Sequence, residues 1–257
     1  MTFPAEWITP RWPVPAMVRA VCTTRADGIS RPPYASLNLG DHVGDHAEAV
    51  AANRAQFGQA LRARPVFMNQ VHGCKAVVLG SQACDGIEAD ACVTATSGIA
   101  CTIMVADCLP ILFAAADGSA VAAAHAGWRG LAGTGGYGVV ESACAALRDH
   151  TAAGLDGTFA WLGPCIGPGA FEVGPEVKAA FEAQDPPAAA LFKARGQGKW
   201  LADLPGLARR RLQALGITRI YGNDGGSQWC TVANASSFFS HRRDRVTGRF
   251  AACIWLA

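Results

Sequence analysis

Three side chains of this sequence could together hold a metal ion. His72 in "NQVHG", Cys108 in "ADCLPILF" and His125 in "AAAHAGWRG" each lie at or just past the end of an apolar segment. Glycine or proline follows within two residues of each, and turns after strands often carry function. Two imidazoles and one thiolate leave the fourth position open, which is the pattern of a catalytic zinc site. The same donors also suit copper.

The same residues admit two other interpretations. Cys108 and His125 could form a nucleophile and its base, with Asp107 or Asn69 orienting the imidazole. Alternatively, His125 is a hydrogen-bonded core histidine and Cys108 is a packed thiol. A metal depresses the pKa of a thiol, as a neighbouring histidine does. The spacing therefore leaves these interpretations open.

The elements that must position these residues follow a mixed α/β pattern. Near-continuous apolar segments predict strands that are covered on both faces. The expected strands are 17–24, 65–72, 98–107, 110–116, 120–126, 158–163, 217–222 and 249–256. The expected helices are 45–61, 136–149, 174–183 and 201–214.

Two local features extend this pattern. The strands within 98–126 follow one another too closely for crossover helices, so we expect an antiparallel meander there and a mixed sheet. Asp45 and Glu48 have the spacing of a capping box at the start of helix 45–61. Because we find no internal repeat and no linker, residues 1–257 are expected to form one domain.

Composition indicates a globular protein and excludes several other classes. Of the 257 residues, 51% are hydrophobic and 16% are charged, and the formal net charge is +2. A sizeable core is therefore possible, and nothing in the charge indicates nucleic acid or a membrane surface as a partner. No apolar run reaches the roughly 18 residues of a membrane span, and no secretory signal is visible. We expect a cytoplasmic monomer whose cysteines are mostly free thiols.

Two sequence signals do not extend to full motifs. "GTGGYG" (133–138) fits G-x-G-x-x-G, but a dinucleotide site also needs an acidic strand end about 20 residues later; Asp156 lies in a loop instead. "GPCIGP" matches part of a nucleobase-deaminase signature but lacks the second cysteine and its glutamate. Neither a nicotinamide site nor a cytidine-deaminase site is indicated.

Seven blocks of the sequence, in order, resemble the YfiH family. The resemblance runs from about residue 18 to the C-terminus. Proteins of this family are variously called polyphenol oxidase of the laccase type, purine nucleoside phosphorylase and peptidoglycan editing factor. The blocks are "TTRADGISRPPYASLNLGDHVGDH", "NQVHG", "EADACVT", "ADCLPILF", "AAAHAGWRGLA", "GPCIGPGAFEV" and "FFSHRRDRVTGRFAACIWL".

The resemblance implies a single-domain α/β fold, with mixed β-sheets packed together and flanked by helices. It implies a zinc held by His72, Cys108 and His125, with copper as the metal that the oxidase name implies. The implied reaction is phosphorolysis of adenosine, inosine, guanosine and methylthioadenosine, with adenosine deaminase as a side activity. The partners would be a purine nucleoside and phosphate. The editing-factor name implies instead a metal-free Cys–His hydrolase acting on a peptidoglycan precursor.

Phosphorolysis requires groups that bind phosphate and ribose. Arg25, Arg129 and Arg242 are candidates for phosphate, because guanidinium forks match phosphate geometry. Asn38 and Gln70 are candidates for hydrogen bonds to ribose or base. The departing base also requires a hydrogen-bond donor at its nitrogen.

The remaining polar residues near these motifs are assigned supporting or surface roles. Asp107 could orient a ligand histidine or pair with an arginine. His241 is expected to support the site from behind the ligands, and His42, His46 and His150 are expected at the surface. Six scattered histidines cannot supply the clusters of a multicopper oxidase.

Overall fold

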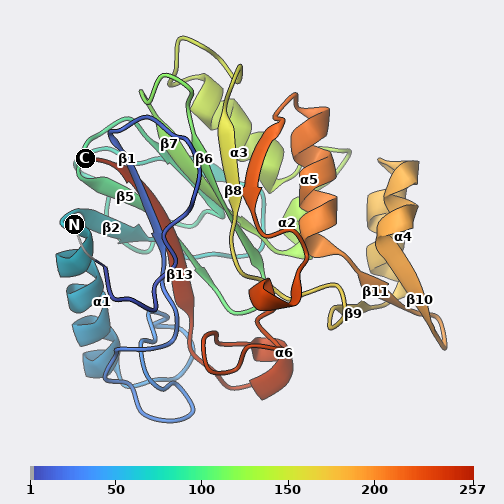
Figure 1. Cartoon of the computed structure of the whole chain (residues 1–257), viewed down its shortest axis with the longest axis horizontal. Helices are drawn as coiled ribbons and strands as arrows, with labels where there is room; N and C mark the ends of the chain where they lie inside the picture. Colours follow the sequence, from blue (N-terminus) through green and yellow to red (C-terminus); the bar gives the residue numbers. More distant parts are fainter. Residues whose placement is uncertain (1–2) are drawn as a thin grey trace.

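A four-stranded sheet forms one half of the central layers in the computed structural model, which describes residues 3–257 (Figure 1). Its order is β1-β13-β5-β2. β13 pairs antiparallel with both β1 and β5, and β2 pairs parallel with β5. The strands are β1 (Val18–Cys22), β2 (Arg64–Phe67), β5 (Ile99–Val105) and β13 (Phe250–Leu256).

A six-stranded sheet packs face to face against the first. Its order is β12-β8-β6-β7-β4-β3. The pairs β12–β8 and β3–β4 are parallel, and the other three pairs are antiparallel. The strands are β3 (Ala76–Val78), β4 (Ala91–Thr94), β6 (Leu109–Ala114), β7 (Val121–Ala126), β8 (Phe159–Leu162) and β12 (Arg219–Gly222).

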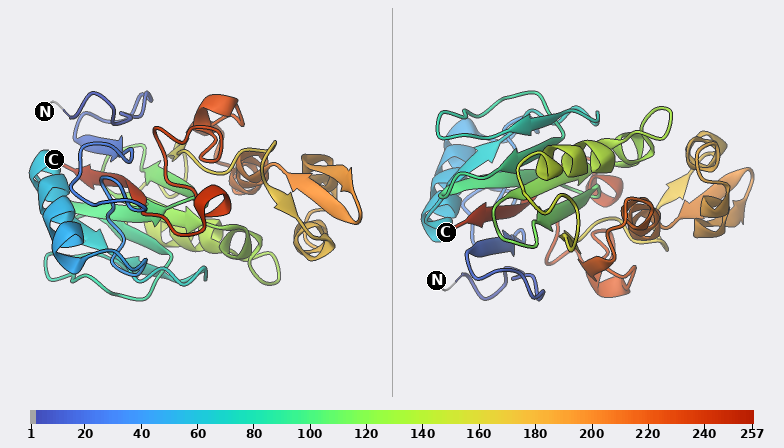
Figure 2. Two further views of the ribbon diagram at one scale, coloured as in Figure 1. Left: turned by 90° about the horizontal axis from the view of Figure 1, so that it is seen from below. Right: turned by 90° about the horizontal axis from the view of Figure 1, so that it is seen from above.

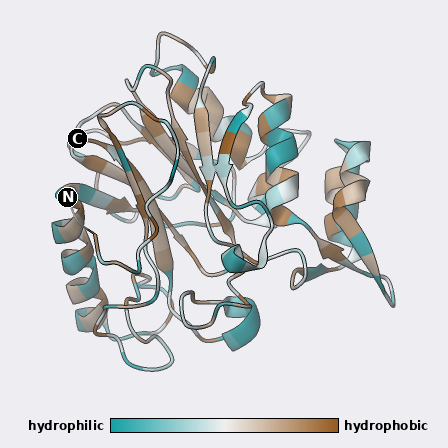
Figure 3. Cartoon of the chain, viewed as in Figure 1, coloured by the Kyte–Doolittle hydropathy of each residue, from teal (hydrophilic) through white to brown (hydrophobic). Residues whose placement is uncertain are grey.

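Helices cover the outer faces of both sheets (Figure 2). α1 (Ala47–Leu61) packs on the four-stranded sheet, where its Phe57 contacts the rings of Phe67 and Trp7 and shares a core cluster with Trp255. α3 (Val139–Arg148) and α5 (Leu204–Ala214) bury their apolar sides against the six-stranded sheet. Because both faces of the central strands are covered, β5, β6 and β7 are buried along their whole length. Figure 3 shows these strands as the hydrophobic centre of the molecule.

Side-chain alternation decides which layer each strand residue enters. On β5, Cys101 and Ile103 face the space between the two sheets, whereas Ala100 and Met104 face α1. On β7, Val121 and Ala123 also point between the sheets. His125, two residues further along β7, therefore points the same way, at the edge of this layer.

A small third sheet extends the molecule beyond one end of the central layers (Figure 1). Its order is β10-β11-β9, and α4 packs against it. Two further short helices follow β7 and precede β13. These elements are β9 (Glu172–Val173), β10 (Phe192–Gly196), β11 (Lys199–Ala202), α2 (Trp128–Ala132), α4 (Pro175–Glu182) and α6 (His241–Asp244).

The expected mixed α/β architecture is confirmed, but the expected meander at 98–126 is wrong. β6 and β7 form the antiparallel hairpin, whereas β5 belongs to the other sheet. The chain crosses from one sheet to the other at Asp107, whose φ of 104° lies outside the usual range for a non-glycine residue. Apolar spacing indicates strands but does not indicate which sheet a strand joins.

The capping box proposed at Asp45 is also wrong. The helix cap is His46, and no side chain caps α1. Asp45 instead accepts hydrogen bonds from the backbone N–H of His46 and from Asn38 Nδ2, at 2.8 and 2.9 Å. Five strands of two to five residues (β3, β4, β9, β10 and β11) were not expected, because so few residues give no readable period. Within residues 3–257, no helix is long and apolar enough to cross a membrane.

Candidate metal centre

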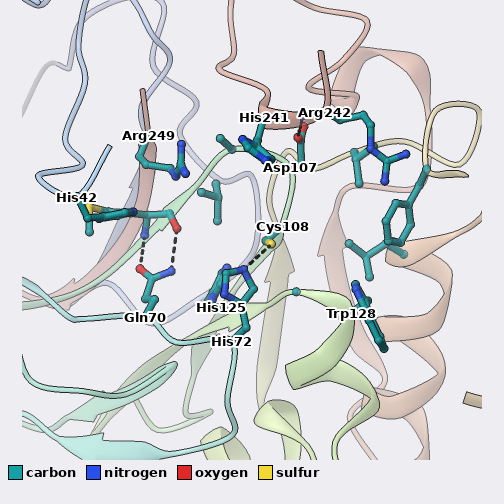
Figure 4. Close-up of a pocket in the computed structure, with 17 residues that line it drawn as sticks. His42, Gln70, His72, Asp107, Cys108, His125, Trp128, His241, Arg242 and Arg249 are labelled. Carbon is teal, nitrogen blue, oxygen red and sulfur yellow. Dashed lines mark hydrogen bonds between the residues drawn. The ribbon is translucent and has the colours of Figure 1, made fainter. Parts of the chain in front are cut away.

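Three side chains that the sequence pattern singled out converge at one edge of the layer between the sheets. His72 lies in the loop after β2, Cys108 in the crossing between β5 and β6, and His125 at the end of β7. One ligand atom of each lies within 4.8 Å of the others. Cys108 Sγ is 3.7 Å from His72 Nε2, and the two imidazoles meet edge to face (Figure 4).

The pairing of β6 with β7 explains why Cys108 meets His125. In this register Pro110 lies opposite His125 and Leu109 opposite Ala126, so Cys108 comes beside Gly127. A Cβ at Gly127 would lie 3.0 Å from both Cys108 Sγ and His72 Cδ2. A larger residue at this position would crowd both the thiol and the imidazole, so glycine favours their close approach.

A buried carboxylate, Asp90, holds both histidines in place. Its Oδ1 lies 2.8 Å from His125 Nδ1. Since an ionised carboxylate only accepts, Nδ1 carries a proton, and Nε2 is the nitrogen that remains for a metal. Asp90 also accepts the backbone N–H groups of Val71, His72 and Gly73 at 3.2, 2.9 and 2.7 Å. These bonds fix a loop in which His72 adopts a left-handed φ of 61°.

The electrostatics of the cluster favour a thiolate. Burial raises the pKa of Cys108, but His125 and His72 outweigh it and lower that pKa to about 6. Burial lowers the pKa of His125, but the thiolate and Asp90 outweigh it and raise that pKa to about 9. Burial of Asp90 is likewise outweighed by His125 and the backbone donors, so its pKa is lowered. Without a metal, these interactions therefore favour the charged forms of both Cys108 and His125.

The cluster opens into a cavity of about 450 Å³. One side is polar and contains His42, His241 and Arg249, whereas Trp128 lies on the other side of Cys108 (Figure 4). The apolar part of the lining consists of Met104, Val105, Ala106, Trp128, Ile166, Phe171 and Leu204.

Of the five predicted substrate-binding residues, Gln70 and Arg242 line this cavity. Both ends of the Gln70 amide bind the backbone of Met104, each at 2.8 Å. The Arg242 guanidinium donates to the carbonyl of Glu172 at 3.0 Å and lies near the Phe171 ring. Each side chain is thus partly engaged in holding the walls of the cavity.

The structure does not bring Arg25, Asn38 or Arg129 to the cavity wall. The Arg25 guanidinium donates to the carbonyls of Ala35 and Ala235 and stacks over Phe239. Arg129 stacks over Trp128 at the surface. Asn38 is fully buried and accepts the backbone N–H of Arg249 at 2.8 Å, so it supports a cavity residue.

Asp107 lines the cavity without contacting a ligand histidine. Its two oxygens accept hydrogen bonds from Thr231 Oγ1 and from the backbone N–H of Arg242, both at 2.6 Å. The orienting carboxylate proposed at Asp107 is therefore found at Asp90. The one available signal was that Asp90 lies in the family-like block "EADACVT".

Three cavity residues were missed or given lesser roles by the sequence reasoning. His42, expected at the surface, is exposed but also lines the cavity. His241 begins α6, Arg249 directly precedes β13, and both line the same cavity. All three lie in the family-like blocks "GDHVGDH" and "SHRRDRVTGRF", which was the available signal.

Comparisons with known proteins cover nearly the whole chain. Residues 19–257 match a family model described as multi-copper polyphenol oxidoreductase laccase. A purine nucleoside phosphorylase of Pseudomonas aeruginosa is 47% identical over 251 residues, which are 97% of this chain and 98% of that protein. The purine nucleoside phosphorylase YfiH of Escherichia coli is 46% identical over 254 residues, 98% of this chain and 99% of that protein.

Solved structures with this fold are also similar in sequence. A Neisseria meningitidis protein of the family DUF152 superimposes with a TM-score of 0.87 at 44% identity, covering 98% of this chain and 99% of that one. YlmD from Geobacillus stearothermophilus superimposes with a TM-score of 0.84 at 32% identity, covering 94% and 92%.

Proposed function

Because this chain belongs to the multi-copper polyphenol oxidoreductase laccase family, with relatives named purine nucleoside phosphorylase, we propose that it is a metal-dependent purine nucleoside phosphorylase. The resemblance to the YfiH family is confirmed by the relative of that name. The proposed substrates are phosphate and adenosine, inosine, guanosine or methylthioadenosine.

The donor set fits a zinc ion. With Zn–S near 2.3 Å and Zn–N near 2.0–2.1 Å, a tetrahedral site places sulfur and nitrogen about 3.6 Å apart. Cys108 Sγ and His72 Nε2 are 3.7 Å apart. Asp90 on His125 Nδ1 matches the carboxylate that commonly orients a ligand histidine. His72, Cys108 and His125 would hold the ion, and when bound it would supply a Lewis acid that polarises a substrate oxygen.

We propose that different parts of the cavity bind the base and the sugar. Trp128 and Phe171 present aromatic surface on which a purine can stack. The ribose would then lie over Cys108, between this aromatic side and the polar side formed by His42, His241 and Arg249. This wall of aromatic and apolar residues also keeps water away from the glycosidic bond.

One observation carries the proposal: a pre-arranged His72–Cys108–His125 set, backed by Asp90, opens into a cavity with an aromatic side. The test combines metal analysis with phosphate-dependent release of base from the four nucleosides. Cys108→Ala and His125→Ala should lose metal and turnover together. Cys84→Ala and His150→Ala, at an exposed thiol and at a histidine outside the cavity, are the matched controls. Turnover by metal-free protein would overturn the proposal.

Adenosine deamination is proposed only as a side activity. Deamination at a metal site requires a general acid/base. Asp107 is the only carboxylate among the described residues that line the cavity, and both of its oxygens are already hydrogen-bonded. Ammonia release from adenosine, measured beside base release, tests this activity.

A cysteine hydrolase is the second candidate function, and one observation favours it. Cys108, His125 and Asp90 are connected as nucleophile, base and orienting acid, and the pKa of Cys108 is lowered to about 6. Such a site could cleave a peptidoglycan precursor. A chelator that leaves activity intact, with an alkylator that abolishes it, would favour this candidate over the phosphorylase.

Copper is the alternative metal because of the family description. The described residues present a single His₂Cys group, whereas multicopper oxidation needs several histidine-rich sites. We therefore propose zinc, and metal analysis of the purified protein distinguishes the two ions.

A further inference from the structure

The polar side of the cavity is built from three distant parts of the chain. His42 comes from the loop before α1, His241 begins α6, and Arg249 directly precedes β13. Figure 4 shows His42 and Arg249 on the side of Cys108 away from Trp128. Three nitrogen-bearing side chains therefore face one part of the cavity.

The backbone at Arg249 is held rigidly. Its N–H donates to Asn38 Oδ1 at 2.8 Å, and its carbonyl accepts the N–H of Leu39 at 3.0 Å. Gly40 lets the side chain pass, because a Cβ there would lie 2.8 Å from Arg249 Cγ. These contacts with Asn38 and Leu39 therefore fix the backbone from which the Arg249 guanidinium extends into the cavity.

The charge of Arg249 has no ion-pair partner among the described residues. Nη1 donates to the carbonyls of Thr247 and Gly248, at 3.1 and 3.0 Å, and no hydrogen bond occupies Nε or Nη2. Cys108 and Asp107 act on this charge from a distance and raise the pKa of Arg249, but burial outweighs them and lowers it. The charge therefore carries a desolvation cost that no direct ion pair offsets. An anion that entered the cavity would relieve this cost and gain charge-assisted hydrogen bonds.

The neighbouring groups distinguish Arg249 from the other cavity arginine. Arg242 already donates to Glu172 and faces Phe171. His42 lines the same side of the cavity as Arg249, and its Nδ1 lies 3.5 Å from an oxygen of the exposed Asp41 carboxylate (Figure 4). Burial and then the charge of Arg249 lower the pKa of His42, although Asp41 acts in the opposite direction. His42 and Arg249 therefore repel each other when both are positively charged, and an anion bound between them would offset this repulsion.

We propose that Arg249 and His42 bind the attacking inorganic phosphate, an inference that rests on the proposed phosphorylase function. A phosphate oxygen forms a bond to the ribose C1′ as the bond from C1′ to the purine nitrogen breaks. The electron pair of that bond leaves with the purine, and the proton carried by hydrogen phosphate ends on the purine nitrogen. Phosphate at Arg249 and purine at Trp128 place C1′ between them, over Cys108.

The test is isothermal titration calorimetry, in which the metal-loaded full chain is titrated with inorganic phosphate alone and the dissociation constant is measured. Arg249→Met should weaken phosphate binding roughly 10- to 100-fold, which is the loss expected for hydrogen bonds to a charged group. Arg249→Lys keeps the charge without the fork and should fall between. His42→Gln should weaken binding about fivefold. Arg148→Met, at an exposed site outside the cavity, removes the same charge and should change nothing.

The outcomes separate this inference from the proposed function. A folded Arg249→Met protein with unchanged phosphate affinity, or a wild type that binds no phosphate, overturns the subsite whether or not nucleosides are turned over. Phosphate binding that depends on Cys108 but not on Arg249 also overturns it. If phosphate binding depends on Arg249 but no nucleoside is turned over, the phosphate subsite is supported and the proposed phosphorylase function is rejected. Where turnover occurs, Arg249→Met should raise the KM for phosphate far more than that for nucleoside.

Discussion

Cys101 and Cys108 lie seven positions apart in the sequence and in the same layer between the two sheets, yet their surroundings differ. Cys101 is buried on β5, and burial followed by Cys92 raises the pKa of its thiol well above the usual value. At Cys108 burial acts in the same direction, but two imidazoles outweigh it and lower the pKa to about 6. The difference shows that the histidines at the sheet edge, and not burial, determine which thiol is chemically active.

The largest expected effect comes from removing the thiol at the edge. Cys108→Ala should abolish both metal binding and turnover, because only two protein ligands remain. Cys101→Ala is the control in the same layer and should keep one metal per chain. Metal content by mass spectrometry, measured beside base release, checks this prediction. Full metal content in Cys108→Ala would contradict the claim that Cys108, unlike Cys101, is a metal ligand.

Alkylation should separate the two thiols by about 100-fold or more at pH 7 in metal-free protein. A thiol with a pKa of about 6 is mostly thiolate at that pH, whereas one with a pKa near 9 is about 1% thiolate. Because the pKa of Cys108 is lowered, its reactivity should fall as the pH drops through 6 and stay level above it. Mass spectrometry of iodoacetamide-treated protein locates the label, and added zinc should protect Cys108. Equal labelling of Cys101 in folded protein would contradict this account.

Asp90→Asn should weaken metal affinity or activity roughly 10- to 100-fold, which is the usual effect of losing the carboxylate behind a ligand histidine. The amide cannot accept from His125 and from three backbone N–H groups as the carboxylate does. Competition with a chelator gives the affinity. Asp117→Asn, at a turn outside the cavity, is the matched control. Unchanged affinity in Asp90→Asn would assign Asp90 a purely structural role.

The smallest effect is expected in the interior. Cys101→Ala should lower the free energy of unfolding by about 1 kcal/mol, the usual cost of a modest core truncation. Its phosphate affinity and turnover should equal those of the wild type. Urea denaturation measures the first quantity. A large loss of turnover in a stably folded Cys101→Ala protein would show that the core thiols also contribute to the chemistry.

The ligands could be predicted from sequence because they are rare residue types at the ends of apolar segments. Asp90 could not, since its role depends on the pairing of β4 with β7, and β4 is too short to show a pattern. Arg249 and His42 come together only through the contact between the loop at Asn38 and the start of β13. Most strands and helices were found, but the position of β5 in the other sheet was not, because both sheets offer apolar neighbours.

The central claim is that His72, Cys108 and His125 hold one metal ion whose open position faces the cavity. Anomalous diffraction at the zinc edge, on crystals of purified protein, tests it most directly. The account predicts one peak per chain, about 2.0–2.3 Å from His72 Nε2, Cys108 Sγ and His125 Nε2. Absence of a peak at these atoms in an active protein, or a peak elsewhere in the chain, would contradict it.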